Sequence, residues 1–447
     1  MNRRFAPLLA LLFSVLTTPA FGEVVTLQQA VKRALESNHL LKAAALEKGA
    51  AEQGVAVSRS RYLPRVSLES GAVLSNTPST VFMMKLDEAR ISPAKDFAAD
   101  PLNNPSPRGD FKTAVTLEQP LLDFGISNGV AMAGKGAEAA ALSEEARREE
   151  IAFRVYVAYL EVRKAQAYRE VAEQSVINAR EHDRLAALRE KDGIGLKSER
   201  LRTATAVAEA EQRVVAANNA VLIARMRLNL VVGGAQGGTL DIGDMPRLEE
   251  PAPETEQLIV LAQKNRPDLK AAENAVERGE LAVKQAKNAY LPTLYARGSY
   301  QLNDRDMPLG TDKDSWNVGV NLRWELFDGM RRSHEKTQAE LTKRSAAEVL
   351  ENERREVALQ VTESVLHRQE ALLRLESARS AVRDAEESRR LVTLRFGNGL
   401  SPLVEVMDAE TALDRARANL VEVENAGYAA TAEVYFRTGV LIQEVMR

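Results

Sequence analysis

Two long stretches without proline constrain the fold of this 447-residue chain more than any other feature, residues 126–191 and 330–394. Proline interrupts a helix because it lacks a backbone N–H and its ring clashes with the preceding turn. Each stretch can therefore form one continuous helix, which at 1.5 Å per residue would be about 100 Å long. We expect two long helical struts.

The apolar pattern indicates that the struts pack against other helices. In the second stretch, apolar residues recur at spacings of three, four and seven, which is typical of the seam between packed helices. Glu and Arg cover the other faces, most simply as a solvated surface with pairs four residues apart. The seam residues are Val361, Val365, Leu372, Leu375, Val382, Ala385 and Val392.

Each strut is followed by closely spaced glycines and then by a second helical pattern, over residues 196–232 and 401–438. Glycine readily adopts the left-handed backbone that ends many helices, and Ser401 followed by Pro402 is typical of a cap and a first helical residue. The sequence therefore predicts two helical hairpins, and their similarity indicates a duplicated architecture. The tip residues are Gly193, Gly195 and Leu196 in the first hairpin, and Gly397, Gly399 and Leu400 in the second.

Four stretches alternate between polar and apolar residues, which is typical of strands with two different faces. They form two expected strand pairs, 65–75 with 111–119 and 293–302 with 315–326, each preceded by a Tyr-Leu-Pro triplet. The loops within the pairs, 76–110 and 303–314, are expected to face solvent. The clearest apolar face comprises Trp316, Val318, Val320, Leu322 and Trp324.

The strands allow two interpretations. Segments of about ten residues with one apolar face fit strands tilted across a bilayer around a wet lumen, but also a soluble antiparallel sheet with one buried face. In lipid, an open four-stranded sheet would leave unpaired backbone groups at two edges, each costing several kcal/mol. Such a sheet can span a membrane only if it closes with other subunits.

The remaining sequence suggests export and a repeated organisation. Residues 1–22 combine Arg3 and Arg4 with a short apolar run and small residues before Glu23, which is typical of a cleavable signal peptide. We expect a first structural repeat over 23–235, a linker over 236–254 and a second repeat over 255–447. The chain has 60 Lys and Arg against 63 Asp and Glu, which gives no electrostatic reason to expect nucleic acid.

No catalytic, cofactor or metal site is predicted. The four histidines are scattered without paired spacing, so neither a zinc site nor a histidine-based triad is indicated. The cluster Glu181, His182 and Asp183 is interpreted as a solvated helix face, because two flexible acids beside one histidine do not converge on one ion. The chain contains no cysteine, so an exported protein of this kind must be stabilised by packing or oligomerisation.

The order of these parts resembles the TolC family of outer membrane efflux proteins over essentially the whole mature chain. The resemblance implies a homotrimer whose chains contribute four strands each to a twelve-stranded barrel, continued by helices as a periplasmic tunnel. It also implies a passive outer membrane channel for efflux or type I secretion that works with a periplasmic adaptor protein and an inner-membrane transporter. The motifs that carry it are the Tyr-Leu-Pro triplets at 62–64 and 290–292, QPLLDFG at 119–125 with its echo LFDG at 326–329, and the tips at Gly195-Leu196 and Gly399-Leu400.

The resemblance also gives the tips a role. They match the periplasmic end of the family, which docks the adaptor and narrows the channel with acidic residues one helical turn apart. The matching residues are Glu405 and Asp408, whose spacing of three places them on one helix face. An ordinary helix surface is the alternative. The positions matched to polar or charged gate-closing partners are Leu201 and Ser401, with Arg200 and Arg202 close by. These residues depart from the pattern of the family, so no specific latch is transferred.

Two other function classes are alternatives to the channel. A periplasmic coiled-coil adaptor or scaffold would also use long helices, but it has no need of strands with a lipid-compatible face such as 316–324. An envelope enzyme would need a convergent polar site. The sequence therefore favours a mainly helical channel protein with a four-stranded sheet.

Overall fold

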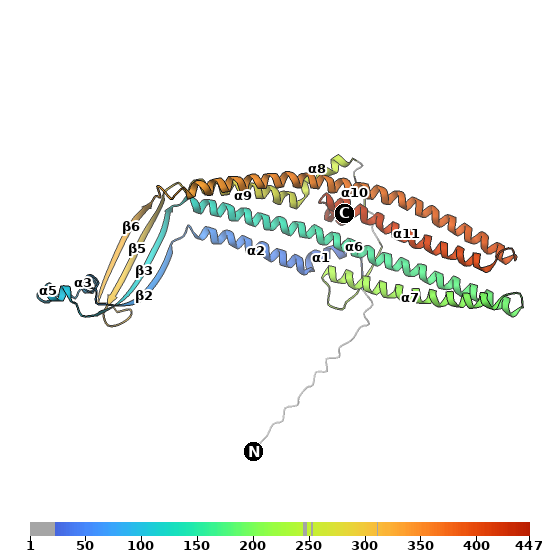
Figure 1. Cartoon of the computed structure of the whole chain (residues 1–447), viewed down its shortest axis with the longest axis horizontal. Helices are drawn as coiled ribbons and strands as arrows, with labels where there is room; N and C mark the ends of the chain where they lie inside the picture. The colour runs from blue at the N-terminus through green and yellow to red at the C-terminus, as the bar shows by residue number, and fades with distance from the viewer. Residues whose placement is uncertain (1–22, 245–247, 252–253, 311) are drawn as a thin grey trace, which may run out of the picture. The chain divides into compact units, whose positions relative to one another are not determined.

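The computed structural model describes residues 23–244, 248–251, 254–310 and 312–447 (Figure 1). The expected signal peptide lies outside the described residues. The chain forms two compact units. One contains Ala43–Ala146 and Arg266–Ala358, and the other contains Arg147–Asn265, Leu359–Arg447 and the amino-terminal segment up to Lys42.

The unit around Ala43–Ala146 contains an antiparallel sheet with the strand order β2-β3-β5-β6. The predicted strands are present, and the central pairing of β3 with β5 joins the two hairpins (Figure 1). Within the described residues β2 and β6 have no neighbour on their outer sides, so both sheet edges are open. The strands are β2 Arg65–Ser75, β3 Arg108–Leu122, β5 Thr293–Asp304 and β6 Lys313–Arg323.

The pairing register separates a polar from an apolar face. Arg65 pairs with Glu118, which pairs with Arg297, so these charged residues share one face. Because successive side chains point to opposite faces, the adjacent row of residues lies on the other face, and its residues are apolar. Every residue of β6 is exposed, including Trp316 at 74% and Val318 at 76%. The adjacent row consists of Val66, Leu117, Gly298 and Val318.

Helices continue this unit from the sheet. Ion pairs connect them side by side, with Lys48–Glu144 (3.1 Å) joining α2 to α6 and Lys343–Glu280 (2.8 Å) joining α10 to α9. A Cβ at Gly279 would lie 3.0 Å from the Lys343 Cα, so α9 and α10 approach each other closely there. The helices are α2 His39–Ser60, α9 Pro267–Asn288, and the amino-terminal parts of α6 Phe124–Lys191 and α10 Arg331–Gly397.

The segment between β2 and β3 differs from the expected solvent-facing loop. It folds into three short helices, α3 Pro78–Asp87, α4 Pro93–Asp96 and α5 Ala99–Asn103. Val81 and Met84 of α3 are buried, and the Phe82 and Phe97 rings meet edge to face at 5.7 Å. The prolines at 78 and 93 begin helices here because the first helical turn does not need their missing N–H.

The second unit contains an apolar core and a small parallel sheet. Thr26 and Gln29 form a reciprocal cap at the start of α1 Leu27–Ser37. Strand β1 Glu23–Val25 pairs with β4 Leu240–Ile242, a pairing that the sequence did not indicate. The Tyr159 hydroxyl donates to the Gly243 carbonyl (2.8 Å) beside this sheet. The core includes Val25, Leu27, Val31, Val155, Tyr159, Leu228 and Leu441, with α12 Leu441–Met446 packed on it.

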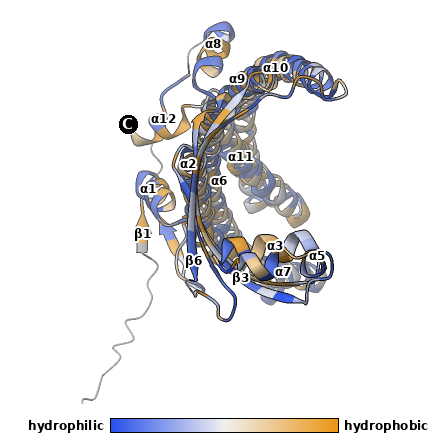
Figure 2. Ribbon diagram, turned by 90° about the vertical axis from the view of Figure 1, so that its left-hand side faces the viewer, coloured by the Kyte–Doolittle hydropathy of each residue, from blue (hydrophilic) through white to orange (hydrophobic). Residues whose placement is uncertain are grey.

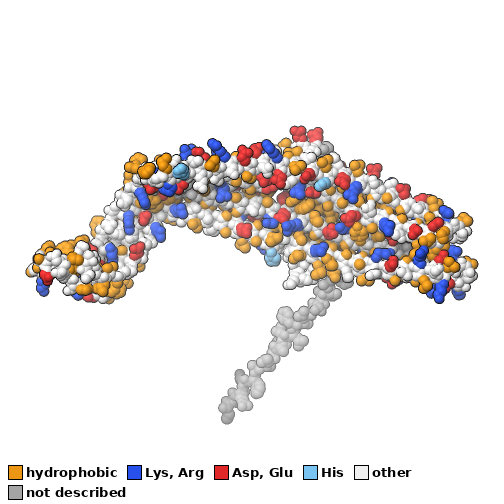
Figure 3. Space-filling model, viewed as in Figure 1, with side chains coloured by type: hydrophobic (Ala, Val, Ile, Leu, Met, Phe, Trp, Pro, Cys, Tyr) orange, Lys and Arg blue, Asp and Glu red, His pale blue; other side chains and the backbone are white. Residues whose placement is uncertain are grey.

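Two helical hairpins complete the second unit. Helix α6 returns as α7 Lys197–Val232, with an Arg180–Glu211 ion pair (2.7 Å) between them. Helix α10 returns as α11 Leu403–Arg437, with an Arg417–Glu386 ion pair (2.8 Å). A further helix, α8, spans Thr255–Asn265. Along the helices, acidic, basic and apolar side chains are interspersed (Figure 3).

Helix α7 is the one described helix that is long and apolar enough to cross a membrane by length and composition. A single such helix is weak evidence, because the core helix of a soluble protein passes the same test. Two of its polar side chains have protein partners, since Arg225 pairs with Asp241 (2.5 Å) and Asn229 donates to the Ala235 carbonyl (2.8 Å). We therefore describe α7 as one arm of a packed hairpin.

Candidate functional site

The first helical tip depends on two glycines. Helix α6 ends at Lys191, and Gly193 has φ +75°, a conformation that glycine adopts without strain. At Gly195, a Cβ would lie 2.9 Å from backbone and side-chain atoms of Arg189. A larger residue at position 195 would therefore displace the end of α6. The Glu199 carboxylate accepts from the Leu196 amide (3.3 Å) and caps the start of α7.

The second tip has the same backbone pattern as the first. Gly399 has φ +72°, and the Leu400 amide donates to the Arg395 carbonyl (2.9 Å), five residues earlier. Ile194 makes the corresponding bond to Arg189 (3.0 Å). Gly193-Ile194 is therefore equivalent to Gly399-Leu400, whereas the motif comparison paired Gly195-Leu196 with Gly399-Leu400. The left-handed glycine defines each turn, and in the first tip this glycine is Gly193. The motif comparison had matched Gly195, two residues later, to Gly399.

The start of α11 differs by one or two residues from the expectation. Pro402 occupies the cap position and the helix begins at Leu403, rather than starting with Ser401 as cap and Pro402 as first residue. The Ser401 side chain is buried, and its hydroxyl bonds to the Glu405 carboxylate. Ser401 therefore positions one of the two predicted aperture acids instead of capping the helix.

An apolar cluster joins the two tips. It contains Ala186 of α6, Phe396 of α10, and Leu403 and Val406 of α11. The Arg189 guanidinium lies over the Phe396 ring at 4.6 Å, which adds a cation–π contact between the hairpins. The ends of the tips carry exposed apolar residues, with Ile194 at 71%, Leu196 at 65% and Leu400 at 69% exposed.

The predicted aperture acids lie on the exposed side of α11. Both Glu405 and Asp408 are exposed, and their spacing of three residues places them on one face of the helix. Asp408 borders an open groove between α7 and α11. The opposite wall of this groove includes Leu201, Arg202, Thr205 and Glu209, so the structure brings Asp408 to the segment where gate-closing partners were sought.

A buried acid, which sequence patterns did not indicate, follows the predicted aperture residues on α11. Glu410 is 9% exposed, and its carboxylate accepts from Arg389 Nη1 (3.1 Å) and Asn178 Nδ2 (3.2 Å). His182 Nε2 lies 3.4 Å from the same carboxylate. Burial opposes ionisation, but the bonds from His182 and Arg389 outweigh it and hold the pKa of Glu410 below its ordinary value. This cluster connects α6, α10 and α11.

A second acid continues the cluster one turn further along α11. Burial raises the pKa of Asp414, and the charge of Glu410 acts in the same direction. A hydrogen bond with Ser175 opposes this shift, and Ser175 also accepts from Arg213 of α7 (3.1 Å). These residues line a cavity of 70 Å³, so the polar cluster extends over all three helices α6, α7 and α11.

The interpretation of residues 181–183 as one solvated face is wrong for two of the three. Glu181 is exposed and pairs with Arg184 (2.6 Å), but His182 faces Glu410 and Asp183 accepts from the Thr203 hydroxyl (2.8 Å). The three side chains have separate partners. A signal for Glu410 did exist, because it occupies the same apolar stripe of α11 as Leu403, Val406 and Leu413, where a charged residue needs a partner.

Comparison with known proteins places the chain among channels. The model of the outer membrane efflux protein family matches residues 30–234 and 258–440. Comparison with curated protein sequences gave no match.

Three solved structures share the fold of the chain. The CmeC outer membrane channel of Campylobacter jejuni is 16% identical, with a TM-score of 0.75 over 98% of this chain and 93% of that chain. VceC, an outer membrane protein of Vibrio cholerae, is 17% identical, with a TM-score of 0.73 over 92% and 96%. The MtrE outer membrane channel of Neisseria gonorrhoeae, in an open state, is 18% identical, with a TM-score of 0.74 over 94% and 90%.

Proposed function

Because the chain belongs to the outer membrane efflux protein family, we propose that it is the exit duct of a tripartite efflux or type I secretion system. In this proposal the protein is an outer membrane channel that is passive, hydrolyses nothing, and is gated at its helical tips. The observation that carries the proposal is the sheet, whose exposed apolar face and open edges adjoin long helices in the same unit. The coiled-coil adaptor alternative has no use for such a face.

The sheet supports a trimeric barrel. With β2 and β6 unpaired on their outer sides, an isolated sheet in lipid would leave backbone N–H and C=O groups without partners, at several kcal/mol each. Pairing β6 of one copy with β2 of the next removes both edges. Three copies of a four-stranded sheet would close a twelve-stranded barrel, with the Arg65–Glu118–Arg297 row facing the lumen and the Val318 row facing lipid.

The tips support a gate and a docking surface. Glu405 and Asp408 would form rings of carboxylates around the periplasmic opening, where they favour cations and repel anions. The exposed Ile194, Leu196 and Leu400 offer apolar contacts to a periplasmic adaptor protein, which would connect the tunnel to an inner-membrane transporter. The signal peptide over residues 1–22 would deliver the chain to the periplasm.

The experiment that tests the proposal uses the purified full-length protein. We expect a trimer by native mass measurement and ion conductance after insertion into planar lipid bilayers. A soluble monomer without conductance would refute the channel. A trimer that conducts ions but whose conductance is independent of tip substitutions would retain the channel and refute the gate.

A further inference from the structure

The helical segment between β2 and β3 lies across one end of the sheet. The segment begins at the end of β2, which forms one edge of the sheet. Helix α3 then contacts β3 and also β6, which forms the opposite edge. The chain returns to β3 only at Arg108. Residues 76–107 therefore reach from one edge of the sheet to the other, at the end remote from the long helices of the same unit (Figure 1).

The position of α3 on the sheet can be read from the strand register. An open hollow of 360 Å³ separates α3 from the sheet, and its sheet side is formed by Val73, Asp110 and Lys112. Val73 pairs with Asp110, and both lie an even number of residues from the Arg65–Glu118 pair. Since side chains alternate between faces, Val73 and Asp110 share the polar face with Arg65 and Glu118. Helix α3 therefore covers the polar face.

We propose that residues 76–107 are a lid over the extracellular mouth of the barrel and that Arg90 is its latch. The lid rests on the proposed function, in which the polar face lines the lumen and this end of the sheet faces outward. It would restrict entry from outside, separately from the gate at the periplasmic tips.

The base of the lid is held by buried contacts. Glu88, at 1% exposure, forms an ion pair with Arg108 at the start of β3. Within the segment, Asp96 accepts from Lys85 Nζ (2.6 Å) and from the Ser92 amide (2.6 Å). Figure 2 shows α3 as mainly apolar, and Figure 3 shows apolar side chains gathered around α3 and α5. The segment is therefore a folded unit that can move as one piece about its base.

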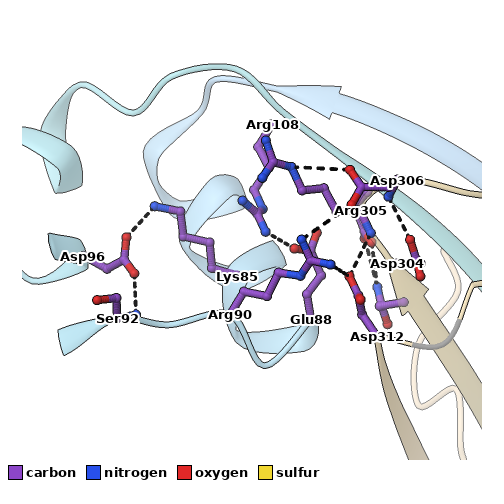
Figure 4. Close-up of polar contacts among 12 residues, drawn as sticks. Lys85, Glu88, Arg90, Ser92, Asp96, Arg108, Asp304, Arg305, Asp306 and Asp312 are labelled. Carbon is purple, nitrogen blue, oxygen red and sulfur yellow. Dashed lines mark hydrogen bonds and ion pairs between the residues drawn. The ribbon is translucent and has the colours of Figure 1, made fainter.

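The free side of the lid is held by one arginine (Figure 4). Arg90 Nη2 lies 2.5 Å from Asp312 Oδ2, and Nη1 lies 3.6 Å from Asp306 Oδ2. Both acids belong to the connection between β5 and β6, at the other edge of the sheet. The Arg90 side chain is 37% exposed, whereas that of Arg108 is 11% exposed. Water competes with the Arg90 contacts, which makes them the weaker and more easily released pair.

Backbone strain lies on both sides of this latch. Ala89 has φ +55° and Leu309 has φ +59°, left-handed conformations that cost a non-glycine residue roughly 1–2 kcal/mol. Such strain persists where surrounding contacts fix the backbone. Ala89 follows the end of α3, where the Arg90 amide donates to the Lys85 carbonyl (2.7 Å) and the Ala89 amide donates to the Leu86 carbonyl (3.0 Å). These bonds hold the turn inside the lid, so release of the Arg90 side chain would let the lid lift with its turn intact.

Cysteine labelling in intact cells tests the lid, because the chain has no cysteine of its own. Asn317→Cys places a thiol on the exposed polar face, since Asn317 pairs with Ser299 in the row next to Arg297. The probe is a maleimide that is membrane-impermeant and too large for general diffusion pores. With Arg90 intact we expect slow labelling. With Arg90→Ala we expect labelling roughly fivefold faster, because an exposed ion pair holds the closed lid only modestly.

Three controls make the outcomes distinguishable. Lys95→Ala removes an exposed charge from the same segment and should leave the rate at position 317 unchanged. The exchange Arg90→Asp with Asp312→Arg should restore slow labelling. Lys95→Cys, an exposed position of the lid, should react rapidly in intact cells. Equal labelling of all cysteine variants after detergent extraction shows that each carries a reactive thiol, and unchanged native gel mobility shows that each is folded.

Either of two results would overturn the lid. Fast labelling of Asn317→Cys with Arg90 intact, or a rate that Arg90→Ala leaves unchanged, would refute it while the barrel stands. Slow labelling of Lys95→Cys in intact cells, followed by full labelling after disruption, would instead refute the outward orientation and with it the proposed function.

Discussion

At the scale of single residues, the tip region combines exposed acids with a buried acid. The side chains of Glu405 and Asp408 are exposed to solvent, whereas the Glu410 carboxylate is enclosed by Arg389, Asn178 and His182. A buried carboxylate without these partners would carry a large desolvation cost. The cluster therefore stabilises the packing of α10 and α11 against α6, and its loss should be measurable as a loss of stability.

We expect Arg389→Ala to lower the free energy of unfolding by about 1–2 kcal/mol, less than for a fully buried pair because Arg389 is 37% exposed. The matched control is Arg390→Ala, which removes the neighbouring arginine and its exposed pair with Glu387 (2.7 Å) and should leave the stability nearly unchanged. Denaturant titration of the purified protein measures both. Equal losses for the two variants would contradict the role given to Glu410.

Stability should also depend on pH through Glu410. Its pKa is lower in the folded protein than the ordinary value of 4.5, so its ionised form stabilises the fold above pH 4.5 and this contribution is lost as pH falls through the lowered pKa. The stability difference between the native protein and Glu410→Gln should shrink as pH falls below 4.5. A difference that grows as pH falls below 4.5 would contradict this linkage.

At the scale of secondary-structure elements, local sequence patterns located most helices and strands. Two-residue alternation identified the strands, and long proline-free stretches identified α6 and α10, since both features depend on residues close in sequence. The segment 76–107 was not recognised as helical because its helices are short and their apolar residues contact one another and the sheet. Two of its five prolines, Pro78 and Pro93, were read as loop signals but begin helices.

The tip turns give a prediction at this scale. Gly195→Val should impair export, because its Cβ would lie 2.9 Å from Arg189 atoms and displace the junction of α6 with α7. Gly136→Ala, on α6 away from the tips, is the control, since nothing lies within 4 Å of the added Cβ. Drug sensitivity of cells measures export, and native gel mobility measures assembly. We expect reduced export with normal assembly for Gly195→Val only, and loss of assembly would show a general folding defect.

At the scale of the whole molecule, compact units and expected repeats divide the chain differently. Each unit contains residues from both halves of the sequence. The division into repeats over 23–235 and 255–447 stays a prediction. Oligomerisation also stays a prediction. The open edges of β2 and β6 give a physical reason for a closed barrel. Three copies would bring six carboxylates, from Glu405 and Asp408, together at the proposed aperture.

These carboxylates give the prediction for the whole channel. Glu405→Ala combined with Asp408→Ala should raise single-channel conductance and reduce cation selectivity, because the repulsion within the rings and their attraction for cations are removed. Glu376→Ala, an exposed acid on α10 about 30 Å before the tip, is the control. Planar-bilayer recordings under a salt gradient measure both quantities. Unchanged channel behaviour in the double variant would refute the aperture assignment.

The sequence by itself determined the features that depend on neighbouring residues: the long helices, the strand faces and the glycine tips. Only the tertiary structure decided which distant residues meet, such as His182 with Glu410, 228 residues apart, and Arg90 with the connection between β5 and β6. Periodicity and turn chemistry act over a few residues, whereas these partners are chosen by packing and strand order. The buried cluster and the proposed lid therefore became visible only in the folded chain.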